Sequence, residues 1–163
     1  MNPIGSETVL QMLRRSYLAV DGLWFMMIEE DEGLERAMEL DERVWQVMPK
    51  IQARRARELL GVEGSSPADL VRCMALKFAA EGHDFVLRRT SSEEASVVIR
   101  QCPWREVLQS AGRMHLAAEI ANRICATEGA VWASEFDESI QFELREALCT
   151  SGDCCRFVFR ATD

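Results

Sequence analysis

The chain has 163 residues, of which 48% are hydrophobic, and its net charge is −8 at neutral pH. This length and composition fit one domain with a substantial core. The acidic balance argues against nucleic acid as a partner, because binding to a polyanion depends on clustered Lys and Arg. An acidic surface fits a small-molecule ligand or substrate better.

Apolar runs are short throughout the sequence. The longest, residues 23–28, is far below the roughly 20 residues that a membrane-spanning helix needs, so we expect no membrane contact. The first 16 residues lack the basic start and apolar stretch of a signal peptide. We therefore expect a cytoplasmic protein whose six cysteines stay reduced and serve as core residues, metal ligands or nucleophiles.

The N-terminal region predicts two helices. A capped amphipathic helix begins at Ser6, and Asp21-Gly22 predicts a break before a second helix over residues 23–31 that Gly33 ends. The second helix is apolar nearly all round. Such a helix lies either in the core or in a subunit interface.

The helical pattern continues to residue 81. Pro49 predicts a kink or interruption in the pattern over residues 34–60, because proline lacks the backbone donor. Ser66-Pro67 then predicts the start of a further helix, which ends at Gly82.

The second half of the sequence mixes strand and helix signals. In chain order, these predict a strand pair at 85–87 and 97–99, helices at 104–111 and 114–135, and a second strand pair at 140–144 and 157–159. The predicted fold is α+β: a helical first half, then an antiparallel sheet of about four strands in two hairpins, covered by helices. We expect a single domain over 1–163, with 1–81 as a helical arm or subdomain and 82–163 as the core that carries the site.

Reactive side chains are concentrated near the C-terminus. Five of the six cysteines and one of the two histidines lie in the last 62 residues. Sulfur and imidazole are ligands for a transition metal such as zinc, and a thiolate is a nucleophile. No P-loop, GxGxxG, GxSxG or HExxH motif is present, which argues against nucleotide-dependent enzymes and standard hydrolases.

A regular helix that begins at His115 would place Glu119 and Asn122 within about 40° of the histidine and Cys125 within about 80°. These residues would line one strip, along which Gly129 leaves room for a ligand or another backbone. The alternative is that Cys125 is a small buried hydrophobe and His115 a satisfied or surface histidine.

The terminal hairpin carries a cysteine pair. Neighbouring residues on a strand project to opposite faces, so we expect Cys155 on the face of Phe157 and Phe159, and Cys154 on the other. Cys149 and Cys154 flank a turn that could place both sulfurs on one metal. An ordinary turn with incidental cysteines is the alternative.

Cys102 precedes Pro103 at a predicted helix start. The positive end of the helix dipole would lower the pKa of this thiol, as a nucleophile or metal ligand requires. A plain structural helix start is the alternative. His83-Asp84 offers a base beside a carboxylate, although adjacent side chains on a strand point apart.

These motifs resemble small bacterial and archaeal proteins of the L-2-amino-thiazoline-4-carboxylic acid hydrolase-like family, whose named activity hydrolyses a carbon–nitrogen bond. The chain departs from many members at Thr127-Glu128, where they have an Asp. The matching segments are Leu23-Trp24-Phe25-Met26, Val44-Trp45 with Pro49, Cys102-Pro103-Trp104, Gly112-Arg113-x-His115, Cys125 and Gly152-Asp153-Cys154-Cys155-Arg156-Phe157-x-Phe159.

The resemblance implies a hydrolase in which a thiolate or a metal-bound water attacks the carbon–nitrogen bond of a small molecule. The predicted catalytic residues are the nucleophiles Cys102 and Cys155 and the proton carriers His115 and Glu119. The predicted ligands of a metal such as zinc are His115, Cys125, Cys149 and Cys154.

Two further hypotheses stay open. A more distant similarity to 4-vinyl reductase-type domains implies a small-molecule or metal-binding module, with an apolar cavity lined by Phe142, Phe157, Phe159 and Trp132. A homodimer joined by the apolar helix at residues 24–28, without catalysis, is the other.

Overall fold

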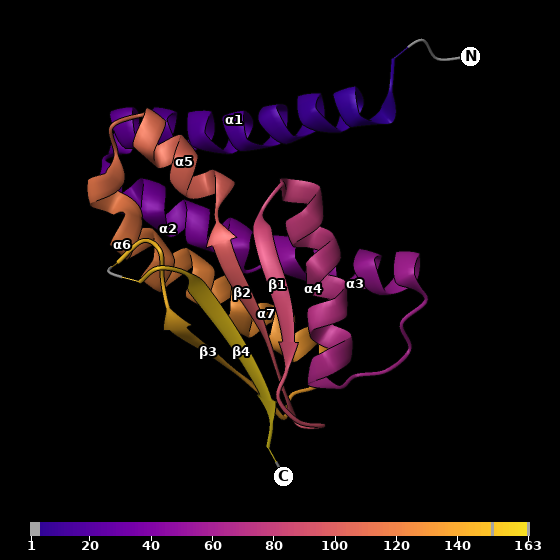
Figure 1. Ribbon diagram of the computed structural model, residues 1–163. Helices are drawn as coiled ribbons and strands as arrows, with labels where there is room; N and C mark the ends of the chain where they lie inside the picture. Colours follow the sequence, from indigo (N-terminus) through magenta and orange to yellow (C-terminus); the bar gives the residue numbers. More distant parts are fainter. Residues whose placement is uncertain (1–3, 151, 163) are drawn as a thin grey trace.

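The protein has an α+β architecture, as predicted, in a computed structural model that describes residues 4–150 and 152–162 (Figure 1). Helices fill the first half, and the strands follow. In chain order, the elements are α1 (Ser6–Glu32), α2 (Leu34–Trp45), α3 (Met48–Leu60), α4 (Pro67–Glu81), β1 (Asp84–Arg89), β2 (Glu94–Gln101), α5 (Pro103–Ser110), η1 (Met114–Leu116), α6 (Ala117–Ile120), η2 (Ala121–Cys125), α7 (Ala126–Phe136), β3 (Ile140–Glu146) and β4 (Cys155–Ala161).

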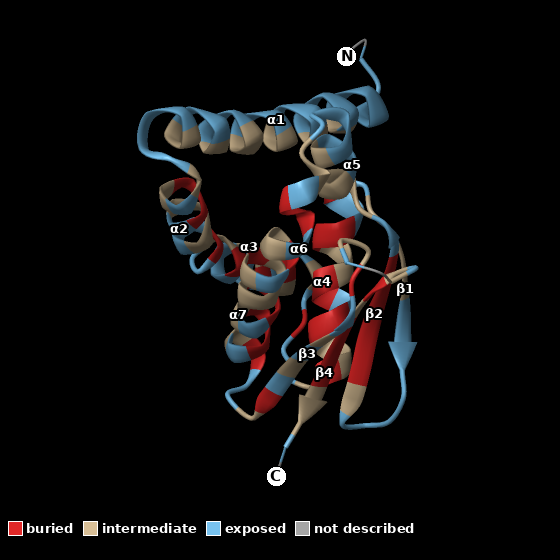
Figure 2. Cartoon of the chain, turned by 90° about the vertical axis from the view of Figure 1, so that its left-hand side faces the viewer, coloured by how far each residue is buried: buried red, intermediate tan, exposed pale blue. Residues whose placement is uncertain are grey.

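The strands form one antiparallel sheet in the order β1-β2-β4-β3. Both predicted hairpins are present, and the sheet becomes continuous because β4 pairs with β2. Val97 on β2 lies opposite Leu87 on one side and Phe157 on the other. Helices α4 and α7 pack on the face that Val97 and Phe157 share (Figure 2).

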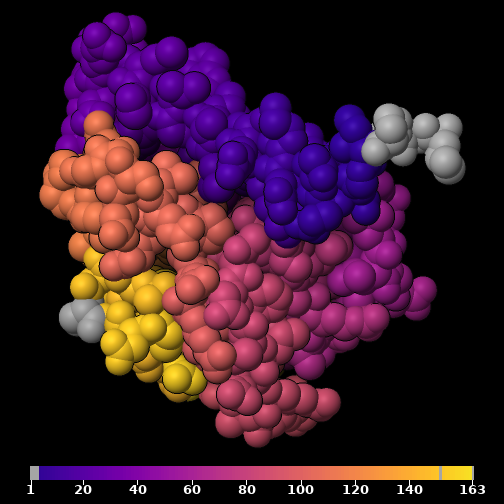
Figure 3. All heavy atoms as spheres, turned by 45° about the horizontal axis from the view of Figure 1, so that its top comes forward, coloured from indigo at the N-terminus to yellow at the C-terminus, as the bar shows by residue number. Residues whose placement is uncertain are grey.

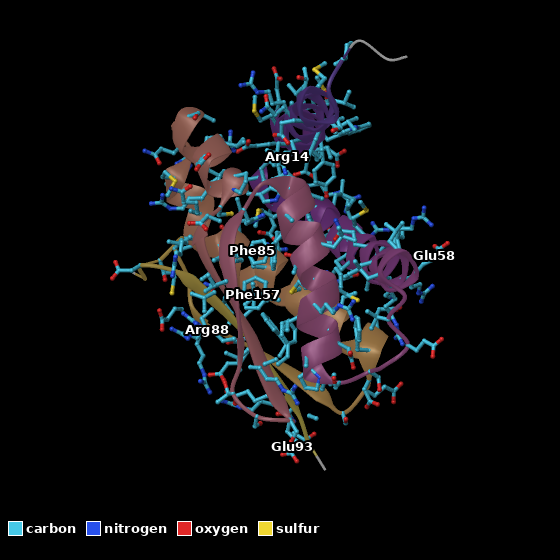
Figure 4. All side chains as sticks on the ribbon, turned by 45° about the vertical axis from the view of Figure 1, so that its right-hand side comes forward. Arg14, Glu58, Phe85, Arg88, Glu93 and Phe157 are labelled. Atoms are coloured by element: carbon cyan, nitrogen blue, oxygen red, sulfur yellow. The ribbon has the colours of Figure 1, made fainter. Side chains whose placement is uncertain are left out.

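Apolar residues at every second strand position build the core between the sheet and these helices. Phe157 and Phe159 pack with Phe78 of α4 and Trp132 of α7, all nearly inaccessible to water. Burial of such side chains contributes roughly 1.5–3 kcal/mol each. Figure 4 shows Phe157 on this inner side, whereas Arg88 points to solvent.

The outer face of the sheet is covered by charged side chains. Arg160 pairs with Glu94 and Glu143, and Arg156 pairs with Glu146. The aliphatic stems of such arginines cover apolar surface while their charged ends stay in water. This arrangement accounts for the burial of Val158, which projects to the same face.

Helix α1 is continuous, so the predicted break at Asp21-Gly22 is wrong. A glycine inside a helix costs about 1 kcal/mol relative to alanine, and packing of the flanking residues outweighs that cost. Tyr17 packs edge-to-face on Trp104, and the Arg14 guanidinium donates to backbone carbonyls at the end of α4. The helix ends at Gly33 as predicted.

The other helix limits follow the predicted signals. Pro49 lies in the first turn of α3, so it separates α3 from α2 rather than kinking one long helix. Ser66 and Asp69 form a reciprocal capping box at the start of α4, and Gly82 ends that helix in the left-handed conformation.

The segment from 114 to 136 is not one regular helix. It passes from the 3-10 turn η1 through α6 into the π-helical turn η2 and then into α7. A π-turn holds more residues per turn than an α-helix, so side chains before and after it do not keep the 100° spacing.

Residues from both 1–81 and 82–163 contribute to one hydrophobic core. The division into a helical arm and a site-bearing core stays a prediction. Over residues 4–150 and 152–162, every helix is too short or too polar to cross a membrane.

Candidate functional site

A cavity of about 150 Å³ lies under α1, where this helix covers α2, α4, α5 and the adjacent end of the sheet. Its wall is largely apolar and holds four thiols. The lining side chains that matter below are Asp21, Gly22, Asp41, Trp45, Lys77, His83, Cys102, Trp104, Cys125, Glu128, Cys149, Cys155 and Phe157.

The predicted aromatic cavity is only partly correct. Phe157 lines the cavity, but Phe142, Phe159 and Trp132 pack in the core. The phenyl ring of Phe142 also fills the space beside Gly129, so this glycine admits a core ring and not a ligand.

Burial keeps the cavity thiols protonated at neutral pH. It raises the pKa of Cys102 to about 12, although the backbone N–H groups of Arg105 and Trp104 act in the opposite direction. The helix start therefore lowers the pKa of this thiol, as predicted, but burial raises that pKa by more. Burial likewise raises the pKa of Cys155 to about 11 and that of Cys125 well above its usual range.

The predicted strip on the helix does not form. His115 and Asn122 are exposed, whereas Cys125 faces the cavity. Glu119 lies 3.5 Å from the Arg123 guanidinium at the surface. The change from 3-10 to α to π turns alters the direction of these side chains, and His115 and Glu119 do not line this cavity.

The paired cysteines divide between the two faces of the sheet, as strand alternation predicts. Cys155 is buried and accepts a hydrogen bond from the Leu148 N–H at 3.2 Å. Cys154 lies on the outer side, where its thiol donates to Glu146 at 3.0 Å. Ser151, in the predicted turn between Cys149 and Cys154, lies outside the described residues.

The predicted zinc ligands are therefore not brought together. Cys125 and Cys149 line the cavity, but His115 is at the surface and Cys154 is on the far face of the sheet. Within the part of the chain that the structure describes, no three His, Cys, Asp or Glu side chains are arranged to hold a metal ion. The donor set does not fit a zinc site.

A buried charged cluster, which the sequence analysis missed, forms one side of the cavity. The Lys77 ammonium lies between the carboxylates of Glu81, at 3.1 Å, and Glu128. The three side chains are only 4–7% exposed. The Trp104 indole N–H also donates to Glu81, at 3.5 Å. Two carboxylates thus surround one ammonium at a site that excludes water.

His83 is a buried imidazole beside this cluster. Its side chain is 3% exposed, and Nδ1 lies 3.6 Å from Glu81, beyond hydrogen-bond distance. Nδ1 has no hydrogen-bond partner among the described residues. Burial, with help from the nearby Lys77 charge, lowers the pKa of His83 to about 3, although an interaction with the Phe78 backbone acts in the opposite direction, so the imidazole is neutral.

Two further carboxyl groups face the cavity from α1 and α2. Asp21 and Asp41 have no cation at ion-pair distance in the described part of the chain. Burial raises the pKa of Asp21 to about 6. Burial and the Asp21 charge together raise the pKa of Asp41 to about 7.

One part of this site had a signal in the sequence. Lys77 and Glu81 are four residues apart on a helix whose other inward positions, such as Met74 and Phe78, are apolar and buried. A charged pair on an apolar helix face indicates a buried ionic cluster. Asp21 and Asp41 lie on separate helices and have no comparable signal.

Comparison with known proteins gives a family and no activity. No curated protein matches the chain. A family model described as a family of unknown function, DUF6125, covers residues 6–155, from the start of α1 to Cys155, and the chain therefore belongs to that family.

Proposed function

We propose that the chain is a small-molecule-binding module whose cavity takes a compact, largely apolar molecule with one hydrogen-bonding group. The carrying observation is the buried, unpartnered Nδ1 of His83 in the wall of an apolar cavity. Buried polar atoms without a partner are costly, so a ligand that satisfies this nitrogen gains affinity there. A cavity of about 150 Å³ suits a ligand the size of one aromatic ring.

The charges around the cavity favour a neutral or cationic ligand. Among the residues that the structure describes, Asp21 and Asp41 have no cation within ion-pair distance, and the Lys77 ammonium is already matched by two carboxylates. A ligand carboxylate would add a like charge in a poorly solvated space, which is unfavourable. A basic nitrogen would instead stabilise the ionised form of Asp41.

Thermal unfolding in the presence of three matched probes tests this function. Benzyl alcohol and benzylamine should raise the unfolding temperature, and benzoate should not. Gly22→Leu is the control variant, because Gly22 lines the cavity and an added Cβ meets nothing within 4 Å. The leucine should fill the cavity and abolish both shifts. Equal shifts in the variant and the wild type, or none in the wild type, would refute the proposal.

A thiol-dependent hydrolase is the second candidate. Cys102 and Cys155 both line the cavity, and Glu128 is a carboxylate of the same cavity that acts on the neighbouring Cys125 thiol. We rank it second because burial keeps these thiols protonated and because a thiazoline carboxylate carries the disfavoured negative charge. Turnover of 2-amino-thiazoline-4-carboxylate that is lost in both Cys102→Ala and Cys155→Ala would reverse the ranking.

The cytoplasm is the compartment that fits the proposed module best. All six cysteines are free thiols, and Cys102, Cys125 and Cys155 adjoin one another around the cavity. Adjacent free thiols persist in a reducing compartment.

A further inference from the structure

The outward face of α1 carries apolar side chains at alternating spacings of four and three residues. Figure 2 shows this face exposed along the whole helix. Such heptad spacing is typical of a seam between two helices. The seam positions are Val9, Leu13, Ser16, Val20, Leu23 and Met27, and its five apolar members are 38–61% exposed.

This seam is separate from the face that α1 uses inside the monomer. Met12 and Trp24, 67% and 66% exposed, lie beside the seam, whereas Tyr17 and Phe25 face inward. Figure 3 shows α1 packed on α5 and α4 with its other side open to solvent. An apolar stripe about 27 Å long on a solvent-exposed face marks an interaction surface.

We propose that a second copy of the chain covers this seam, with the two α1 helices antiparallel about a twofold axis between Ser16 and Val20. Each seam is then complementary to itself, with Leu13 of one copy opposite Leu23 of the other and Val9 opposite Met27. The two-copy arrangement buries every exposed apolar seam residue at once, as a closed symmetric dimer requires. It does not depend on what the cavity binds.

The charge distribution along α1 selects the antiparallel orientation. Its C-terminal end carries Glu29, Glu30, Asp31 and Glu32, whereas its N-terminal half carries Arg15 and also Arg14, which is bonded to the carbonyls of α4. An antiparallel pair brings the acidic end of each helix to the positive end of the other helix dipole. A parallel pair would bring both acidic ends together, which repels.

The same charges disfavour a lipid surface as the occupant. Helices that lie on membranes are rich in Lys and Arg beside the apolar face. Here Arg14 is already bonded to the carbonyls of Ala79 and Ala80, and the C-terminal end is acidic. A second copy of the chain, packed antiparallel, therefore suits the outward face of α1 better than a lipid surface does.

Sedimentation equilibrium of the full chain tests the dimer. We expect twice the mass of one chain at micromolar concentration. Val20→Glu should raise the dissociation constant at least 100-fold, because it places two carboxylates in the buried seam close to the axis. Leu59→Glu is the matched control, since Leu59 is an equally exposed apolar residue on α3 and should leave the dimer intact. Circular dichroism reports whether both variants remain folded.

A charge pair then tests the orientation. Leu13→Glu and Leu23→Lys chains should form mixed dimers in preference to either homodimer, measured by native mass spectrometry. A parallel seam would not pair these positions. A monomer at 100 µM, a dimer that Val20→Glu leaves unchanged, or a monomer that sediments with phosphatidylcholine vesicles would each overturn the proposal.

Discussion

Replacing Lys77 with methionine should destabilise the protein severely. Methionine nearly conserves the length of the side chain but removes its charge, which leaves Glu81 and Glu128 buried together without a counterion. Removing one partner of a buried ion cluster costs about 3–5 kcal/mol. With a urea dependence of about 2 kcal/mol/M for a chain of this size, the unfolding midpoint should fall by about 2 M.

The loss of stability in Lys77→Met should depend on pH. Burial already raises the pKa of Glu81, and Lys77 opposes that shift, so its removal raises the pKa further. A carboxyl whose pKa is higher in the folded state stabilises the fold when protonated and loses that contribution as pH rises through the folded value. The deficit of Lys77→Met should therefore be smaller at pH 5 than at pH 8.

Urea unfolding at pH 5, 6.5 and 8, followed by fluorescence of the buried Trp45 and Trp132, measures this effect. Lys50→Met, at an exposed position on α3, is the control and should change stability by no more than about 0.5 kcal/mol. A deficit below about 1 kcal/mol at pH 8, or one that does not change with pH, would refute the assignment of Lys77 as the counterion.

Three other substitutions probe the site and its surroundings. Gly129→Ala should lower the free energy of unfolding by about 1–3 kcal/mol in urea, because its methyl group meets the Phe142 ring. Asp41→Asn should exceed the wild type in stability at pH 8 by on the order of 1 kcal/mol and match it at pH 4, since the raised pKa of Asp41 removes stability as pH rises through about 7. Cys154→Ser should abolish the fast phase of thiol labelling by a disulfide reagent in the native protein; persistence of that phase would place it on another cysteine.

The sequence predicts most of the fold because its signals are local. Gly33, Pro49 and the Ser66 cap mark helix limits through backbone chemistry, and period-two alternation marks the strands. The break at Gly22 fails because packing of α1 on distant helices outweighs a local cost of about 1 kcal/mol.

The site was harder to predict because it depends on distant contacts. Cys102, Cys125, Cys149 and Cys155 do meet around one cavity, but burial cancels the reactivity that their spacing suggests. Asp21, Asp41, Lys77 and Glu81 come from α1, α2 and α4, in the half of the chain that showed no reactive pattern, and Glu128 comes from α7. Only tertiary packing brings Asp21 into the same cavity as Asp41, Lys77 and His83.

The π-turn at Ala121–Cys125 has a consequence for comparing members of this family. Such a turn accommodates one extra residue, and deleting that residue would rotate the preceding helix by about 100° relative to α7. A relative that lacks the extra residue would still place its equivalents of Glu128 and Trp132 correctly. An alignment therefore needs a one-residue gap inside this turn, and a gap placed elsewhere would assign Cys125 the wrong counterpart.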